Sequence, residues 1–207
     1  MKIAVVIPAY NEEKTIRDVL KVVKETEIID EIIVVDDGSL DHTAEIARLE
    51  GVKVISLEKN VGKGGAVKAG FNSTDAKIIV LLDADLLNLS PRHINALLEP
   101  VIKDGADMTL GIFGNGRFRT DFAQKVAPTL TGQRAIKREL LEATAHLDIA
   151  RFGVEKALTE CAKTKKANVV LVKLDGVSHV TKEEKLGFWE GFKARVRMYW
   201  EILKAMH

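Results

Sequence analysis

The sequence of 207 residues is poor in cysteine, in aromatic residues and in long hydrophobic runs, and each shortage excludes a class of protein. The single cysteine, Cys161, rules out an intrachain disulfide and a zinc site built from several thiolates. No apolar stretch approaches the roughly 20 residues that a membrane-spanning helix needs, and the N-terminal segment lacks the pattern of a secretory signal. We therefore expect a cytoplasmic protein.

Neither sign of charge is in excess. Lys and Arg number 31 and Asp and Glu number 30, which leaves a net charge of +1. Such a balance supplies no long-range field for nucleic acid, so we expect no nucleic-acid partner. The hydrophobic fraction of 46% and the charged fraction of 29% are ordinary for a globular chain, and the length suits a single domain over residues 1–207.

Buried strands and amphipathic helices alternate through the first half of the chain. Continuous runs rich in β-branched residues are typical of strands covered on both faces, as in a parallel sheet. Such runs lie at residues 3–7, 32–35, 52–57 and 78–82. Helical patterns separate them at residues 14–26, 43–50 and 65–72. The alternation predicts an α/β fold with a mostly parallel central sheet flanked by helices.

The second half is less regular. Ser90 followed by Pro91 is a typical helix start, and predicts a helix over residues 91–103. A strand is expected at 107–113, a long loop at 114–128, helices at 135–145 and 154–165, a strand at 169–174 and a terminal helix at 185–206. A loop of that length usually has a function or lacks order.

Acidic side chains gather where the predicted strands end. Asp36 and Asp37 follow the second strand, and Asp83 and Asp85 follow the fourth. Ligands of an open parallel sheet bind at this edge, and clustered carboxylates repel one another unless a cation or a donor group lies between them. Carboxylate oxygens suit Mg²⁺ or Mn²⁺. The aspartates therefore predict a divalent metal site, although a short acidic triplet also occurs in solvated turns.

Two further loops allow more than one interpretation. Asp37, Gly38 and Ser39 suit an ordinary turn into a helix, but a carboxylate there is also placed to accept from a nucleobase N–H. Gly62 and Lys63 precede a helix, so their amides and ammonium either face an anion or form a plain turn with a solvated lysine.

Several segments, taken in order, resemble a known family. PAYNEEKTI, VVDDGSLDHT, NVGKGGAVKAG and LLDADLLNLSP are similar to the nucleotide-sugar-binding half of family 2 glycosyltransferases with the GT-A fold. LTGQRAIKRELL, FGVEKAL and SHVTKEEKLG resemble the small bacterial subgroup related to glucosyl-3-phosphoglycerate synthases. The resemblance implies a nucleotide-sugar half at about 1–112 and a half at about 113–207 that completes the acceptor and metal sites.

The resemblance also implies roles for individual residues. The nucleotide sugar, taken to be a UDP-sugar, would contact Pro8, Ala9, Tyr10, Glu12, Asp37, Ser39, Lys63, Asp83, Ala84, Gly132 and Gln133. Asp37, Ser39 and Lys63 would lie near the base, and Asp83 near the ribose. Asp85 and His179 would hold Mg²⁺ or Mn²⁺. Arg134 would bind a phosphate or carboxylate, and Glu155 would act as general base or hold sugar hydroxyls.

The implied activity is metal-dependent transfer of a sugar to a phosphorylated small molecule or a lipid phosphate. A nucleotidyltransferase that makes nucleotide sugars is an alternative, but its first loop is usually basic, whereas Glu12 and Glu13 make this one acidic. A catalytically inert nucleotide-sugar-binding subunit is another. The aromatic and basic segment at 188–200 suits packing on the body or in a homodimer, or peripheral contact with a membrane.

Overall fold

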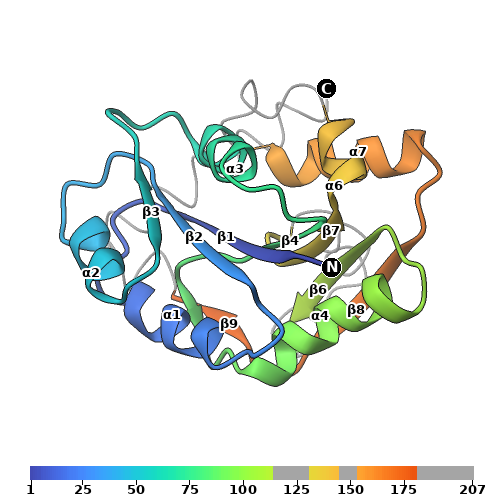
Figure 1. The fold of residues 1–207 in the computed structure, drawn as a ribbon, viewed down its shortest axis with the longest axis horizontal. Coiled ribbons are helices and arrows are strands. Elements are labelled where there is room, and N and C mark those ends of the chain that lie inside the picture. Colours follow the sequence, from blue (N-terminus) through green and yellow to red (C-terminus); the bar gives the residue numbers. More distant parts are fainter. Residues whose placement is uncertain (114–130, 145–152, 181–207) are drawn as a thin grey trace, which may run out of the picture. The chain divides into compact units, whose positions relative to one another are not determined.

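The computed structural model describes residues 1–113, 131–144 and 153–180 (Figure 1). The chain divides into one compact unit, Met1–Val177, and a second, Ser178–His207. Of the second unit the described part contains the short strand β9 (Ser178–His179). Within the described ranges, no helix has the length and apolar character needed to cross a membrane.

A seven-stranded sheet forms the centre of the first unit, in the order β3-β2-β1-β4-β7-β6-β8. Neighbouring strands run parallel except around β7, which is antiparallel to both β4 and β6. The mostly parallel sheet is therefore confirmed. The strands are β1 (Ile3–Ala9), β2 (Glu31–Asp36), β3 (Lys53–Ser56), β4 (Ile78–Leu81), β6 (Met108–Phe113), β7 (Arg134–Lys137) and β8 (Val169–Leu174).

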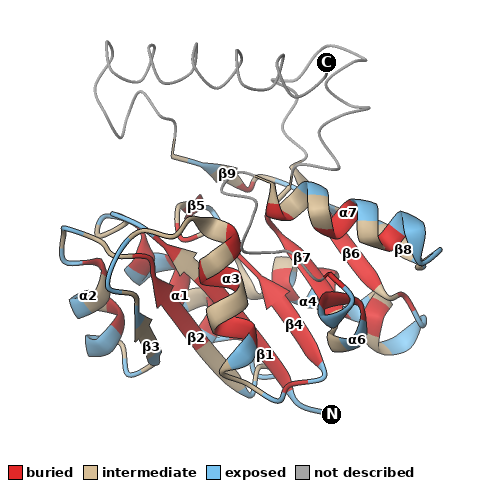
Figure 2. Ribbon diagram, turned by 90° about the horizontal axis from the view of Figure 1, so that it is seen from above, coloured by how far each residue is buried: buried red, intermediate tan, exposed pale blue. Residues whose placement is uncertain are grey.

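Helices cover both faces of this sheet, and the strands between them are buried (Figures 1 and 2). Alternate residues of β1 point to opposite faces, so Val5 belongs to one hydrophobic cluster and Val6 to the other. One face carries α1 (Ile16–Lys24), α2 (Thr43–Leu49) and α4 (Pro91–Lys103), and the other carries α3 (Lys63–Asn72), α6 (Arg138–Glu142) and α7 (Val154–Thr164). The short strand β5 (Leu86–Leu87) follows β4.

The start of α4 is where the sequence placed it. Ser90 is the N-cap, Pro91 is the first helical residue, and the backbone N–H of Ser90 donates to Nδ1 of His93 at 3.2 Å. The histidine thus takes the reciprocal capping role more often filled by Glu or Gln. The expected helix over residues 91–103 is confirmed.

The expected helix over residues 135–145 is wrong in its first part. Residues 134–137 form β7, and the helical turn begins only at Arg138. Ile136 lies opposite both Ile79 of β4 and Met108 of β6, and it is fully buried. β4 and β6 pair with the two edges of β7, and Ala135 and Ile136 pack into the hydrophobic clusters on opposite faces of the sheet. Because both faces are buried, the short apolar run carries no alternation that distinguishes it from a buried helix. The tertiary position decides the conformation here.

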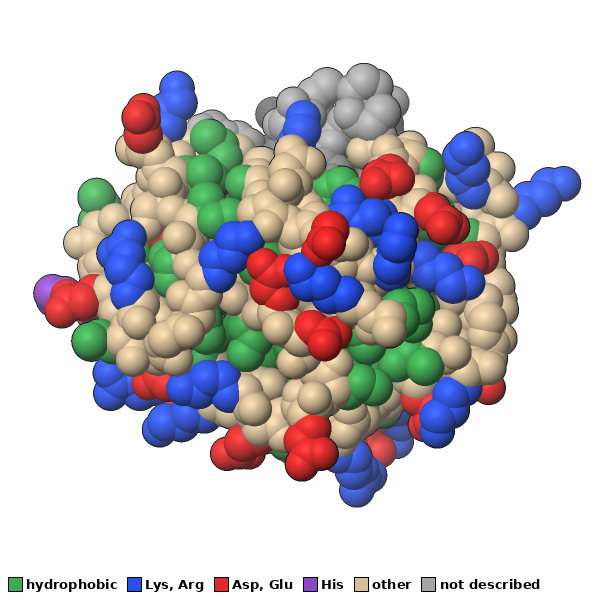
Figure 3. All heavy atoms as spheres, viewed as in Figure 1, with side chains coloured by type: hydrophobic (Ala, Val, Ile, Leu, Met, Phe, Trp, Pro, Cys, Tyr) green, Lys and Arg blue, Asp and Glu red, His purple; other side chains and the backbone are tan. Residues whose placement is uncertain are grey.

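Two other expectations, the loop at 114–128 and the terminal helix at 185–206, lie outside the described residues. The strand expected at 107–113 and the helix at 154–165 agree with β6 and α7. Figure 3 shows acidic and basic side chains interspersed over one face of the molecule. The mixture agrees with the net charge of +1, and neither sign forms a broad patch on this face.

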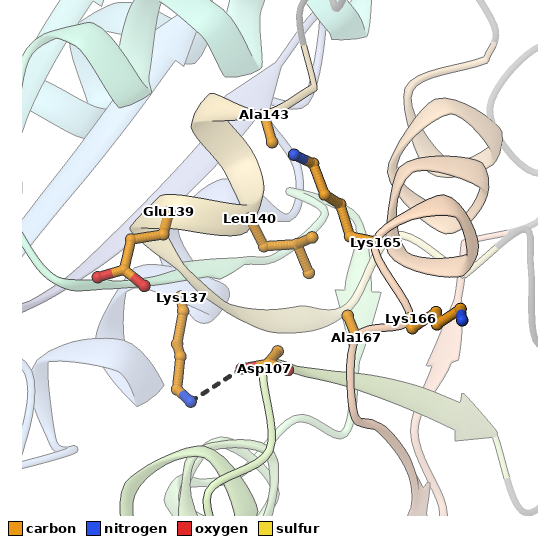
Figure 4. Close-up of a pocket in the computed structure, with 8 residues that line it drawn as sticks. All are labelled: Asp107, Lys137, Glu139, Leu140, Ala143, Lys165, Lys166 and Ala167. Carbon is orange, nitrogen blue, oxygen red and sulfur yellow. Dashed lines mark hydrogen bonds and ion pairs between the residues drawn. The ribbon is translucent and has the colours of Figure 1, made fainter.

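A surface depression of about 220 Å³ lies beside α6, next to the start of β6 and the end of β7 (Figure 4). It is lined by Asp107, Lys137, Glu139, Leu140, Ala143, Lys165, Lys166 and Ala167. Lys137 Nζ lies 2.9 Å from Asp107 Oδ1, and the backbone N–H of Asn168 donates to Asp107 Oδ2 at 2.9 Å. Asp107 therefore ties the starts of β6 and β8 to the end of β7.

Replacing Asp107 by asparagine should lower the free energy of unfolding by about 0.5 kcal/mol at neutral pH, the scale of an exposed ion pair. The hydrogen bond from Asn168 and the charge of Lys137 lower the pKa of Asp107 in the folded chain. The ionised carboxylate therefore contributes stability above its unfolded pKa of about 3.9, and this contribution is lost as the pH falls through the lower folded pKa. Urea unfolding from pH 7 downward should show the two proteins converging in acid. An equal difference at all pH values would contradict the prediction.

Candidate active site

The loops after β1 and β2 are joined by hydrogen bonds. The register pairs Ala9 with Asp36, so the two strands end side by side. The N–H of Asn11 donates to Ser39 Oγ at 3.0 Å, and the N–H of Leu40 donates to Asn11 Oδ1 at 2.8 Å. Asn11 adopts a positive φ of 56°, which turns the chain sharply at this point. The loop that holds Ser39 is thereby braced by the loop that follows β1.

The remaining candidate residues of the first loop differ in exposure. Pro8 and Ala9 are the last residues of β1, and Ala9 is buried. Tyr10, just past the strand, is 43% exposed and so is free to meet a ligand. The N–H of Glu12 donates to Thr43 Oγ1 at 2.8 Å, which ties this loop to the start of α2.

Asp37 is buried and braces a third loop. Its two carboxylate oxygens accept from the backbone N–H groups of Val61 and Gly62, at 2.8 and 2.9 Å. Its own N–H donates to the carbonyl of Ala9 at 2.8 Å. Gly62 has a φ of 87°, a conformation that favours glycine, and it is the N-cap of α3. Asp37 thus orders the loop that leads into Lys63, and its contact with a base stays a prediction.

Lys63, Asp83 and Glu155 meet at the carboxyl edge of the sheet although they are far apart in sequence. Lys63 begins α3, Asp83 follows β4, and Glu155 lies in the first turn of α7. Lys63 Nζ is 2.6 Å from Asp83 Oδ1 and 2.5 Å from Glu155 Oε1. Burial lowers the pKa of Lys63, but the two carboxylates raise it more, so that the net shift is upward. The ammonium is therefore charged and bonded to both acids.

Gly132 and Gln133 enclose Asp83 from the other side. Gln133 is fully buried, and its Nε2 donates to Asp83 Oδ2 at 2.8 Å. A Cβ atom added at Gly132 would lie 2.5 Å from Asp83 Oδ2 and 2.6 Å from Lys63 Nζ. Only a residue without a side chain fits there while the ion pair is in place. Gln133 thus holds the carboxylate of Asp83, and the expected contact of both residues with the nucleotide sugar stays a prediction.

Arg134 is fully buried in β7. Its Nε donates to the carbonyl of Thr131 at 2.9 Å, and its Nη1 donates to Thr159 Oγ1 at 3.1 Å. Burial lowers the pKa of Arg134 to about 10, while the negative charges of Glu155 and Asp83 oppose the shift. The guanidinium is thus held by internal hydrogen bonds and interacts electrostatically with the two acids. The structure gives it no exposed surface with which to bind an acceptor directly.

The proposed metal ligands belong to two units of the chain. Asp83 and Asp85 each offer a carboxylate oxygen, and these oxygens lie within 4.8 Å of one another. Ala84 between them is buried. Two hard oxygen donors at that separation fit a magnesium or manganese ion. His179 is exposed and lies in β9 of the second unit, so its place in the metal site stays a prediction.

Sequence reasoning allowed that the amide of Gly62 faces an anion, but it did not identify Asp37 as that anion or Thr159 as a partner of Arg134. Thr159 holds Arg134, and the amides of Val61 and Gly62 hold Asp37. The glycine at position 62 was the available signal, because a glycine directly before a helix suggests a positive φ. The sequence around Thr159 gave no such signal, since a threonine inside a helix is ordinary.

Comparison with known proteins identifies the chain's relatives. The model of glycosyl transferase family 2 matches residues 4–160. An undecaprenyl-phosphate 4-deoxy-4-formamido-L-arabinose transferase of Edwardsiella ictaluri is 32% identical over 173 residues, which cover 77% of this chain and 52% of that protein. A glucosyl-3-phosphoglycerate synthase of Mycobacterium tuberculosis is 31% identical over 193 residues, which cover 75% of this chain and 59% of the relative.

A solved structure shares the fold. The crystal structure of the Mycobacterium tuberculosis synthase in complex with Mn²⁺, UDP-glucose and phosphoglyceric acid superposes with a TM-score of 0.72 at 28% identity. The match covers 86% of this chain and 71% of that one. The chain spans about half the length of the curated relatives it matches. The family match, the sheet order and the expected motifs agree, and the chain belongs to glycosyl transferase family 2, with the GT-A fold.

Proposed function

We propose that this chain is a metal-dependent glycosyltransferase that moves a sugar from a UDP-sugar to an acceptor bearing a phosphate group. The observation that carries the proposal is the meeting of Lys63, Asp83 and Glu155 at the carboxyl edge of the sheet. Ligands of open α/β sheets bind at that edge. Support comes from the structural relative, which was crystallised with Mn²⁺ and UDP-glucose.

We assign the parts of the donor to different residues at this edge. We assign the base to the loops that hold Tyr10, Asp37 and Ser39, because these loops are braced together at the ends of β1 and β2. The ribose is assigned to Asp83. Glu155, whose side chain is 13% exposed, lies beside Asp83 on the sugar side and either holds sugar hydroxyls or takes the acceptor proton.

We assign the metal to Asp85 and His179, with Asp83 close by. The donor set of two carboxylates and an imidazole suits Mg²⁺ or Mn²⁺. A bound divalent cation would take up the charge that develops on the leaving diphosphate, which is worth several kcal/mol in a transition state. The chain's own contribution is to hold Asp85 rigidly, between the buried Ala84 and Leu86.

The acceptor is proposed from the relatives by its shared chemistry. Their names indicate undecaprenyl phosphate in one case and phosphoglycerate in the other, and both carry a phosphate monoester. Arg134 is buried and Lys63 is bonded to two carboxylates, so we assign no residue to this phosphate. A homodimer or a membrane contact of the segment at 188–200 stays a prediction, because that segment lies outside the described residues.

Calorimetric titration with UDP tests the donor assignment. We expect binding in the presence of Mn²⁺ that weakens at least tenfold in EDTA, because the diphosphate then lacks its cation. Binding that is absent, or that is equally tight without metal, would contradict the proposal. Release of UDP from UDP-glucose, measured with phosphoglycerate and with undecaprenyl phosphate in separate reactions, distinguishes the two acceptors. Release of pyrophosphate from UTP and a sugar phosphate would instead indicate a nucleotidyltransferase.

A further inference from the structure

The ammonium of Lys63 joins two carboxylates that come from opposite sides of the site. Asp83 belongs to the end of a central strand, whereas Glu155 belongs to a helix that packs on the sheet. The side chains of Asp83 and Glu155 are only 19% and 13% exposed, and both oxygens lie within 2.6 Å of the same nitrogen. The ammonium of Lys63 is bonded to both acids, and its expected place near the base stays a prediction.

Hydrogen bonds also hold the backbone that leads into Lys63. The carboxylate of Asp37 accepts from the N–H groups of Val61 and Gly62, the two residues directly before it. Asp37 is 4% exposed, so this brace is shielded from competing water. Asp37, which follows β2, therefore orders the separate loop between β3 and α3 that leads into Lys63.

Lys63 offsets part of the negative charge at this site, to which Asp85 adds a carboxylate within 4.8 Å of that of Asp83. Asp83 and Glu155 carry two negative charges, and Lys63 and the buried Arg134 carry two positive ones. Without Lys63 the two carboxylates would repel one another across a partly buried site. Asp83 would keep its hydrogen bond from Gln133, so Glu155 would be the group that moves away.

We propose that Lys63 is a positioning residue that holds the Glu155 carboxylate, and with it the first turn of α7, against Asp83. The catalytic consequence rests on the proposed function, because Glu155 is the residue assigned to the sugar. The structural part does not rest on the proposed function, because the three side chains meet without any ligand. Lys63 thus acts on the reaction through Glu155.

A thermodynamic cycle in the absence of metal and nucleotide tests the structural part. Lys63→Met should lower the melting temperature in EDTA by several degrees, about 2–4 °C for each kcal/mol lost in a chain of this size. Glu155→Gln in the same chain removes the repulsion between the two carboxylates, so the double variant should lose less than the sum of the two single losses, although it also lacks the bond from Lys63 to Asp83. Lys156→Met, which removes an exposed lysine from the same helix, is the matched control and should change the melting temperature little. Additive losses for Lys63 and Glu155 would overturn the proposal.

Kinetics test the catalytic part. Lys63→Met should lower kcat about 100-fold, the scale of a misplaced catalytic group, and change the KM for the donor less than about threefold. In the Glu155→Gln background the same substitution should have little further effect. A rise in KM at unchanged kcat would instead place Lys63 on the donor and overturn the proposal.

The melting temperatures and the kinetics test the role of Lys63 and the proposed function separately. If no nucleotide sugar is turned over but the melting temperatures are non-additive, the proposed function fails and the role of Lys63 stands. If Lys63→Met does not fold by itself, a folded double variant supports the proposal, because the unpaired carboxylate is then the cause. A double variant that also fails to fold overturns it.

Discussion

Asp85→Ala is expected to lower metal-dependent release of UDP by about a thousandfold, the rate equivalent of about 4 kcal/mol of lost transition-state stabilisation. Asp85 directly follows the buried Ala84, and its carboxylate is within 4.8 Å of a ligand atom of Asp83. The substitution removes the carboxylate of the residue in the first unit that we assign to the metal. The measurement is the rate of UDP release from UDP-glucose at several Mn²⁺ concentrations.

A surface acid on the same unit provides the control. Asp18 lies in α1 with its side chain 80% exposed, so Asp18→Ala should retain the rate of the unaltered protein. Circular dichroism and thermal unfolding in EDTA should show that Asp85→Ala is folded. Turnover by Asp85→Ala at the original rate, with the same dependence on Mn²⁺, would refute the assignment of this residue to the metal.

Gly132→Ala is expected to lower kcat about 100-fold, because a displacement near 1 Å at a reacting centre has effects of that size. The added methyl would lie 2.5 Å from Asp83 Oδ2 and 2.6 Å from Lys63 Nζ, closer than atoms can approach. The ends of the Asp83 and Lys63 side chains must then shift away from the methyl group, which changes the geometry of the ion pair. Single-turnover kinetics with saturating donor would measure the effect on the chemical step.

Gly70→Ala is a matched control for crowding by a methyl group. A Cβ atom at Gly70 would meet Val6 Cγ1 at 2.4 Å, which is as severe a contact but between α3 and the apolar interior of the sheet. Overpacking of this kind costs about 1–3 kcal/mol of stability. Gly70→Ala should therefore melt at a lower temperature and keep its kcat, whereas Gly132→Ala should lose kcat. Equal losses of kcat in both variants would show that crowding, not the position of the acids, is responsible.

The alternating elements of the first half were predictable because their signals are local. The run at 3–7 and the helical pattern at 14–26 predict β1 and α1, whose observed bounds are Ile3–Ala9 and Ile16–Lys24. Ser90 and Pro91 likewise predict the start of α4. Each of these signals lies within a few residues of the element it specifies, so no knowledge of distant partners is needed.

The strand β7 was not predictable for the opposite reason. Arg134 and Lys137 at its ends are polar, and Ala135 and Ile136 between them suit a helix as well as a strand. Their conformation follows from the space between β4 and β6, where every backbone group of an inserted strand finds a partner. Arg134 is buried by the same placement, and its guanidinium donates to Thr131 and Thr159 inside the protein.

By itself the amino-acid sequence determined the α/β class, the family and the edge of the sheet at which the acids gather, because these depend on local patterns and on the order of motifs. Only the tertiary structure decided that Lys63 bonds Asp83 and Glu155, that Gln133 holds Asp83, and that Arg134 has no exposed surface. Such contacts join residues 20 to 92 positions apart. Their geometry depends on how α3, α7 and β7 pack on one sheet, and no local pattern records it.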